Sequence, residues 1–172
     1  MIRIYHCLLL GICFALTACI REDFVYGEAG ILPGDRLPEF RVELNDGSSL
    51  TTSDLKGKVS VLVFFHTECP DCQEEFPVIQ RLYDTYQEQD SVVVYCISRE
   101  QPADEIEAYW QAHGLTLPYS AQEDRSIYSL FSEQGIPRVY VSTPDLEVYS
   151  TYTDDPIPSF NQLTADIEAC LH

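Results

Sequence analysis

Residues 58–65 (KVSVLVFF) limit the possible folds of this chain more than any other stretch, because the run is almost entirely β-branched or aromatic. A continuous apolar run of this length is typical of a strand that is buried on both faces of a sheet. The motif Cys69-Pro70-Asp71-Cys72 follows the run after three residues. The sequence therefore predicts a buried strand whose end carries a pair of cysteines.

The segments after this strand alternate between helix and strand patterns. Residues 70–89 carry apolar side chains at three- and four-residue steps, which predicts a helix with Pro70 in its first turn and a kink at Pro77. The further elements expected are helices at 102–114, around 126–131 and at 160–171, and strands at 91–97, 135–142 and 146–152. Such alternation predicts an α/β sandwich around one central sheet.

Residues 40–50 precede the buried strand and alternate apolar and polar side chains around Asn45, Asp46 and Gly47, a pattern that favours a β-hairpin. No repeat, low-complexity tract or second linker follows residue 35. With 172 residues the chain is long enough for one core and too short for two comfortable ones. One domain at 35–172, with an N-terminal hairpin, is therefore expected.

The first 19 residues have the pattern of an export signal. Arg3 precedes an apolar run at 7–16, which is shorter than the roughly 20 residues needed to span a bilayer. The motif LTAC, which ends at Cys19, resembles the bacterial lipoprotein box and implies that residues 1–18 are a signal peptide and that Cys19 is lipidated. The alternative is an ordinary signal peptide with a chance cysteine. Residues 19–34 are expected to be the lipidated N-terminus and a flexible tether.

Lipidation implies export and anchoring to the inner or outer membrane of a bacterial envelope, where disulfides can persist. The domain is then expected to face the periplasm. Residues 21–23 (RED) loosely resemble a signal for the cell surface, which is the alternative location. The chain has 28 Asp and Glu against 10 Lys and Arg, a formal charge of −18, which argues against nucleic acid or an anionic lipid surface as a partner.

The cysteine pair lies where a helix is expected to begin. Unpaired backbone N–H groups and the helix dipole stabilise a thiolate at such a position, so Cys69 is the candidate attacking sulfur. Cys72 is one turn further along the same helix, near enough for a disulfide and less exposed. The pair thus has the arrangement of an attacking and a resolving thiol.

Two other uses of the pair are open. Zinc needs four ligands, and the remaining candidates, Cys96, His113, Cys170 and His172, contain no second close pair. A purely structural disulfide is the other alternative, although a loop this short constrains the unfolded chain only weakly. Thiol-disulfide exchange is the leading interpretation, and no metal or cofactor is expected.

Taken together, these residues resemble thioredoxin-fold thiol-disulfide oxidoreductases of the TlpA and ResA type, from about Gly34 to the C-terminus. Residues 37–65 are similar to the family's hairpin and active-site strand, Cys69 and Cys72 fall on its redox pair, and Pro77 on its helix-kinking proline. Ile136-Pro137 falls on the family's cis-proline segment.

The resemblance implies a thioredoxin-like fold, in which a central mixed β-sheet is flanked by helices and carries an N-terminal hairpin. It also implies that Cys69 attacks a substrate disulfide, that Cys72 resolves the mixed disulfide, and that Ile136 and Pro137 lie beside the bound substrate. A proline that begins a strand in trans is the alternative for Pro137.

Deprotonation of the resolving cysteine requires a base. Thioredoxin has a buried Asp six residues before its first Cys, but here that place is Val63, which cannot titrate. Glu75 lies one helical turn after Cys72, where the reductase branch of the family carries its functional glutamate. Glu75 is therefore the candidate proton acceptor, and the alternative is a solvated helix residue like Glu74.

Three residues near the pair are candidates for tuning its redox potential. Glu68 and Asp71 place two carboxylates beside Cys69 and oppose the negative charge of its thiolate, which favours a reductant over a strong oxidant. His66 would act in the other direction if protonated, and its alternative is a plain strand-end side chain.

Cys96, Cys170 and Trp110 are interpreted as core residues. Cys96 lies within a wholly apolar strand, and Cys170 lies beside the apolar face of the last helix. Trp110 lies on a different helix from the cysteine motif and is expected to pack in the core.

The main rival function is a thiol peroxidase, because peroxiredoxins share the fold and the hairpin. Their motif has Pro seven residues and Thr or Ser three residues before the reactive Cys, whereas this chain has Leu62 and His66 there. A non-catalytic binding module is the second rival. The leading prediction is a reductase that acts on disulfide-containing envelope proteins and receives electrons from a membrane protein.

Overall fold

A five-stranded sheet forms the centre of the protein, whose computed structural model describes residues 30–172. The strand order is β5-β4-β3-β6-β7, so that the apolar run found in the sequence is the middle strand. The strands are β3 (Val59–Phe65), β4 (Val92–Ser98), β5 (Tyr119–Ser120), β6 (Arg138–Ser142) and β7 (Val148–Tyr152). Strand β3 pairs with β4 in parallel and with β6 antiparallel, which makes the sheet mixed.

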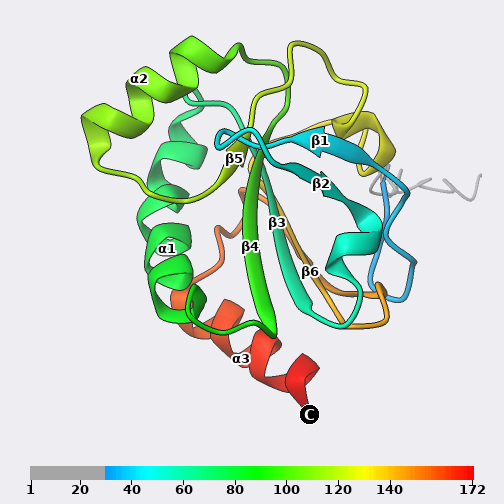
Figure 1. Ribbon diagram of the computed structural model, residues 1–172. Coiled ribbons are helices and arrows are strands. Elements are labelled where there is room, and N and C mark those ends of the chain that lie inside the picture. The colour runs from blue at the N-terminus through cyan, green and yellow to red at the C-terminus, as the bar shows by residue number, and fades with distance from the viewer. Residues whose placement is uncertain (1–29) are drawn as a thin grey trace, which may run out of the picture.

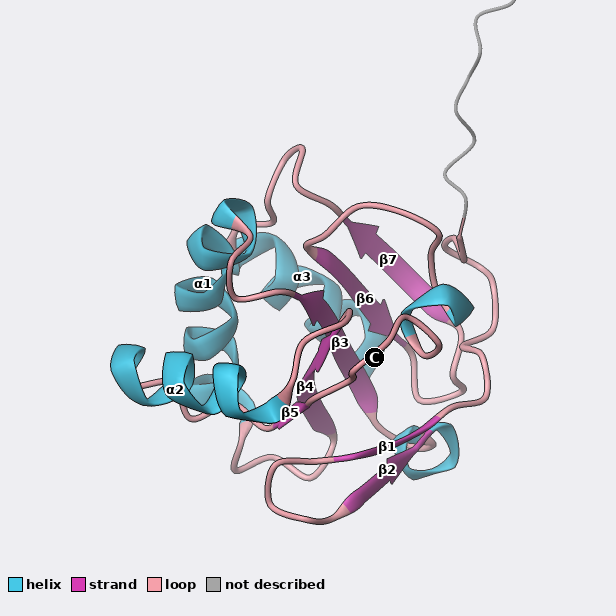
Figure 2. Cartoon of the chain, turned by 90° about the horizontal axis from the view of Figure 1, so that it is seen from above, coloured by secondary structure: helices cyan, strands magenta, loops and turns pink. Residues whose placement is uncertain are grey.

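Helices and a hairpin cover the two faces of this sheet (Figures 1 and 2). The helices are α1 (Pro70–Tyr86), α2 (Ala103–His113) and α3 (Phe160–Leu171), and side chains of all three belong to one apolar cluster. The antiparallel hairpin of β1 (Arg41–Glu43) and β2 (Ser49–Thr51), with the short 3-10 helix η1 (Thr52–Leu55), packs on the other face. The predicted thioredoxin-like fold is confirmed.

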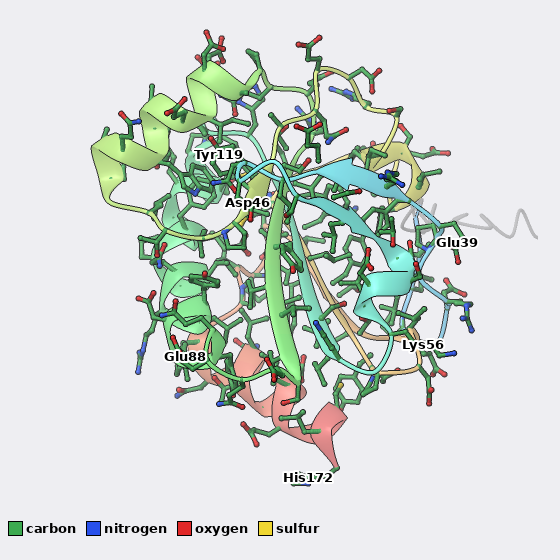
Figure 3. All side chains as sticks on the ribbon, in the orientation of Figure 1. Glu39, Asp46, Lys56, Glu88, Tyr119 and His172 are labelled. Atoms are coloured by element: carbon green, nitrogen blue, oxygen red, sulfur yellow. The ribbon has the colours of Figure 1, made fainter. Side chains whose placement is uncertain are left out.

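Strand β3 divides the core because successive side chains of a strand point to opposite faces. Val61 and Val63 belong to the cluster under the helices, whereas Leu62 and Phe64 belong to the cluster under the hairpin, and all four are fully buried. Figure 3 shows side chains filling both layers, while charged residues such as Glu88 lie at the periphery. This two-sided burial explains why the run carries no polar face.

Several boundaries differ from the predictions. Strand β5 has only two residues and was not predicted, and the helix expected around 126–131 is one turn of 3-10 helix, η2 (Tyr128–Leu130). Helix α1 ends at Tyr86, three residues earlier than predicted, and it contains Pro77 in its interior as predicted. Trp110 is buried as predicted, and its indole N–H donates to the carbonyl of Leu117 at 3.0 Å.

The folded domain begins before residue 35. The sequence predicts that residues 30–34 belong to the tether, yet Ile31 donates its N–H to the Phe131 carbonyl at 2.9 Å and Gly34 donates its N–H to the Val148 carbonyl at 2.8 Å. The folded domain therefore includes these residues. The predicted signal peptide at 1–18 and the lipidation site Cys19 lie outside the described residues. No helix within residues 30–172 is long and apolar enough to cross a membrane.

Candidate active site

Four residues, 66–69, connect the end of β3 to the start of α1, and the last of them is the first cysteine of the motif. Cys69 is the residue that caps the helix N-terminus, in extended conformation, and Pro70 is the first helical residue. Pro suits this position because its fixed φ is helical and its missing N–H would have no intrahelical partner there. The Cys69 N–H donates to the His66 carbonyl at 3.0 Å, which closes the turn.

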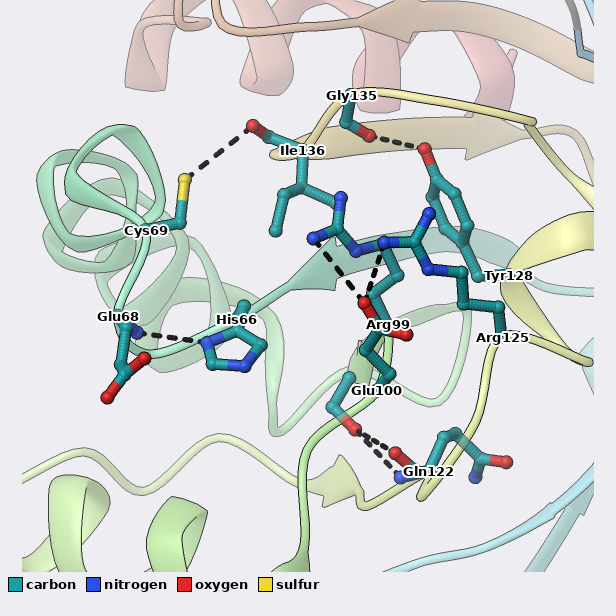
Figure 4. Close-up of polar contacts among 11 residues, drawn as sticks. His66, Glu68, Cys69, Arg99, Glu100, Gln122, Arg125, Tyr128, Gly135 and Ile136 are labelled. Atoms are coloured by element: carbon teal, nitrogen blue, oxygen red, sulfur yellow. Dashed lines mark hydrogen bonds and ion pairs between the residues drawn. The ribbon is translucent and has the colours of Figure 1, made fainter.

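The Cys69 sulfur is half-buried and faces a backbone carbonyl from a distant segment. Its thiol donates to the carbonyl oxygen of Ile136 at 3.6 Å, as the dashed line in Figure 4 shows. The Ile136–Pro137 peptide bond is cis, which confirms the prediction for Pro137. The cysteine motif and the Ile136–Pro137 segment, predicted to meet, are therefore in contact.

Cys72 differs sharply from Cys69 in its surroundings. Its side chain is fully buried one turn into α1, and both cysteines carry free thiols. Burial raises the pKa of the Cys72 thiol well above its ordinary value, and the neighbouring Cys69 and Glu75 raise it further. Cys72 is thus a protonated thiol at neutral pH and requires a proton acceptor before it can attack.

Glu75 lies one helical turn beyond Cys72 and is only 1% exposed, whereas Glu74 faces solvent. Burial raises the pKa of the Glu75 carboxyl to about 8. Its Oε1 is buried without a hydrogen-bond partner among the described residues. A carboxyl group in this state can exchange a proton near neutral pH, which a solvated glutamate cannot do efficiently.

A third thiol lies in the strand next to β3. Cys96 is opposite Val63 in the β3–β4 register and is fully buried. Burial raises the pKa of its thiol, and the charge of Glu75 adds to this effect. Cys170 on α3 is half-buried against the same cluster, and burial raises its pKa to about 11. Both cysteines have the surroundings of packing residues.

The three residues proposed to tune the redox potential differ in their exposure to solvent. Glu68 and Asp71 are exposed to solvent, and His66 is half-buried. The Nδ1 atom of His66 accepts a hydrogen bond from the Glu68 N–H at 3.2 Å, so the neutral ring carries its proton on Nε2. The carboxylates therefore lie on the solvent side of the sulfur, and the imidazole lies at the strand end.

Two glutamines that the sequence analysis did not single out hold the active-site turn. The buried Gln101 accepts from the Thr67 N–H at 2.9 Å through its Oε1 and donates to the Thr67 hydroxyl through its Nε2. Gln73 donates to the Thr67 carbonyl at 2.7 Å. Nothing in the local sequence marks Gln101, because its partner is 34 residues away in the chain.

Such a fold, with a helix that begins at a Cys-x-x-Cys motif opposite a cis-proline, defines the class of thioredoxin-like proteins with a dithiol site. More narrowly, the chain belongs to the AhpC/TSA family, whose model matches residues 33–150. Within residues 30–172, no group of His, Cys, Asp and Glu side chains is placed to bind a metal ion.

Relatives and solved structures agree with this assignment. The chain is 28% identical over 130 residues to the thiol-disulfide oxidoreductase ResA of Bacillus subtilis, which covers 76% of this chain and 72% of that protein. It is also similar in fold to a thiol:disulfide interchange protein of Chlorobium tepidum, with a TM-score of 0.70 and 21% identity over 84% of this chain and all of the other. The structure of StoA from Bacillus subtilis is similar as well, with a TM-score of 0.65 and 23% identity over 78% of this chain and 98% of StoA. The relatives support an oxidoreductase that acts on thiols and disulfides.

Proposed function

We propose that this protein is a protein-disulfide reductase of a bacterial envelope. The observation that carries the proposal is the arrangement of three groups along one helix. A half-buried thiol, Cys69, lies at the helix N-terminus, a buried thiol, Cys72, lies one turn inward, and a buried carboxyl group, Glu75, lies one turn beyond.

The reaction consists of two successive displacements at sulfur. The Cys69 thiolate attacks one sulfur of a substrate disulfide, so that a mixed disulfide forms and the other substrate sulfur leaves as a thiolate. The Cys72 thiolate then attacks Cys69, which releases the second substrate thiolate and leaves a Cys69–Cys72 disulfide. Two electrons pass to the substrate, and a dithiol donor must return two electrons to the pair.

Glu75 supports the second displacement. Because burial keeps Cys72 protonated, the attack requires a base close to it, and a carboxyl with a pKa of about 8 is matched to this task near neutral pH. The unpartnered Oε1 leaves one carboxyl oxygen free to accept the proton. The rival interpretation, a solvated helix residue, disagrees with the 1% exposure of Glu75.

The segment at Ile136 and Pro137 is the proposed substrate-binding edge. The Ile136 carbonyl already accepts a hydrogen bond from Cys69, and an extended substrate segment that places its disulfide against Cys69 would lie along this backbone.

Two carboxylates of the active site favour reduction of the substrate over its oxidation. Glu68 and Asp71 oppose the negative charge of a Cys69 thiolate and so do not stabilise the reduced pair, whereas strong oxidants stabilise their reduced form.

The proposed location and partners follow from the sequence. Lipidation at Cys19, after removal of residues 1–18, would tether the domain to the inner or outer membrane, facing the periplasm or the cell surface. Disulfide-containing envelope proteins would be its substrates, and a membrane protein would supply electrons. Nucleic acid is not an expected partner.

The experiment mixes the reduced protein, in the form the cell produces, with insulin and measures the release of the insulin chains. We expect turnover with dithiothreitol as donor, no turnover for Cys69→Ser, and a trapped mixed disulfide through Cys69 for Cys72→Ser. Cys96→Ser is the matched control and should keep activity, because Cys96 is buried away from solvent.

Three results would contradict the proposal. Insulin reduction by Cys69→Ser at the wild-type rate would remove Cys69 from the chemistry. Faster oxidation of the reduced pair by hydrogen peroxide than by a peptide disulfide would favour the thiol peroxidase instead. Full retention of a binding partner by Cys69→Ser, without turnover by the wild type, would indicate a binding module.

A further inference from the structure

Arg99 lies at the edge of the sheet that carries the active site. Strands β3 and β4 are parallel, with Phe65 opposite Ser98, so that Arg99 is the next residue beside His66. The Arg99 N–H donates to the Phe65 carbonyl at 2.9 Å, which fixes its backbone at the start of the active-site turn.

The Arg99 side chain extends toward the segment that contacts Cys69. Its guanidinium carbon is 6.0 Å from the centre of the Tyr128 ring, and the Tyr128 hydroxyl donates to the carbonyl of Gly135, the neighbour of Ile136. Figure 4 shows the Arg99 guanidinium on the Ile136 side of Glu100. A cation is therefore held beside the proposed substrate-binding edge.

This guanidinium has hydrogen-bonding capacity that the described residues do not use. Its Nε is buried without a hydrogen-bond partner, although the side chain as a whole is 21% exposed. Glu100 accepts a hydrogen bond from Arg125 at 2.6 Å, and the same carboxylate forms only a loose ion pair with Arg99 at 3.9 Å, beyond hydrogen-bond distance. The two arginines thus share one carboxylate, and Arg125 holds its hydrogen bond.

We propose that Arg99 binds a carboxylate of the substrate and so selects disulfides that have an acidic residue close to the cysteine attacked by Cys69. This inference rests on the proposed reductase function and adds a specificity determinant to it. A carboxylate fits because the guanidinium offers several N–H donors in a plane, which match two carboxylate oxygens.

The charge pattern around Cys69 gives this selection a direction. Glu68 and Asp71 are exposed carboxylates on the α1 side of the sulfur, whereas Arg99 and Arg125 lie on the β4 side with Glu100 between them. Two arginines and one carboxylate leave this group with a positive charge, on a chain whose formal charge is −18. An acidic side chain of the substrate would therefore be repelled from α1 and drawn to the edge that carries Arg99.

The test compares two synthetic peptide disulfides, the homodimers of Ac-Gly-Glu-Cys-Glu-Gly-NH2 and Ac-Gly-Gln-Cys-Gln-Gly-NH2. Single-turnover reduction by the reduced protein is measured for each, and each rate is divided by the rate with dithiothreitol, which removes differences in peptide reactivity. The variants are Arg99→Gln, Arg99→Lys and, as a matched control, Arg41→Gln, which removes an exposed arginine from the hairpin.

We expect wild type and Arg41→Gln to prefer the Glu peptide about fivefold, an amount that a partly exposed ion pair can supply. Arg99→Gln should abolish this preference, Arg99→Lys should keep part of it, and high salt should weaken it. A preference unchanged in Arg99→Gln overturns the inference. If that variant does not fold, a wild-type ratio near one, or one insensitive to salt, overturns it equally.

Failure of the underlying function has a different signature. If wild type reduces neither peptide above the uncatalysed rate, the reductase proposal fails. If wild type reduces both peptides well without preferring the acidic one, the reductase proposal stands and only the role of Arg99 is refuted.

Discussion

Replacement of Glu75 by Gln should make the protein more stable, and the gain should grow with pH. The folded protein holds the Glu75 carboxyl with a pKa of about 8, raised by burial from an ordinary value of 4.5. The native state therefore keeps a proton that the unfolded chain gives up. The stability that this proton supports is fully present below about pH 4.5 and is lost progressively as the pH rises to about 8.

The size of the effect follows from this difference in pKa. Each unit of difference corresponds to about 1.4 kcal/mol, and most of the interval is crossed between about pH 5 and about pH 8. Gln has nearly the same shape and is neutral throughout. The free energy of unfolding of Glu75→Gln, relative to wild type, should therefore increase by about 3 kcal/mol over this range.

Urea unfolding in reducing buffer measures this directly, followed by the fluorescence of Trp110, the only tryptophan of the chain and buried in the native state. Glu74→Gln is the matched control, because Glu74 is the exposed neighbour on the same helix and should show no such trend. If the difference in the free energy of unfolding between Glu75→Gln and wild type is the same at about pH 5 and at about pH 8, the argument that Glu75 is buried as a protonated carboxyl is refuted.

Three further predictions concern the site and its support. In single-turnover kinetics, the resolution of the mixed disulfide should speed up as the pH rises through about 8, because Glu75 is then ionised, and Glu75→Gln should lack this inflection. Gln101→Leu should lower the free energy of unfolding by about 1–3 kcal/mol, since it leaves the buried Thr67 N–H without its acceptor; equal urea midpoints would contradict this. Cys96→Ala should lower stability by about 1 kcal/mol while leaving the insulin-reduction rate unchanged, and a lost rate would show that Cys96 takes part in the chemistry.

The fold was predictable where burial leaves a periodic signal. The sequence of β3 is a continuous apolar run because both faces of this strand are buried. The apolar residues of α1 recur every three or four positions because only one face of this helix is buried. Strand β5 escaped prediction because two residues, Tyr119 and Ser120, carry no period, and their pairing with β4 is decided by tertiary contacts.

The site was predictable only in part, for a similar reason. The spacing of Cys69, Cys72 and Glu75 follows from helical geometry, so the sequence alone suggested that they share one helix. The burial that separates Glu75 from Glu74 depends on where that helix packs on the sheet. The support from Gln101 depends on a contact between segments distant in sequence and gives no local pattern.

Contacts of the N-terminal residues were missed because their signal is weak. Residues 30–34 contain Gly and Pro and no apolar period, which is the composition of a linker. Their backbone nevertheless pairs with residues near η2 and β7, as the Gly30–Ser132 bridge shows. Backbone pairing of this kind needs no particular side chains and therefore leaves no trace in composition.

The most direct test of the proposed reductase function is the reduction potential of the Cys69–Cys72 pair, measured by equilibration with glutathione or dithiothreitol and read from the peptide that contains both cysteines. The exposed carboxylates beside Cys69 predict a value close to that of thioredoxin, about −270 mV. A value near about −120 mV, typical of a strong oxidant, would contradict the assignment as a reductase.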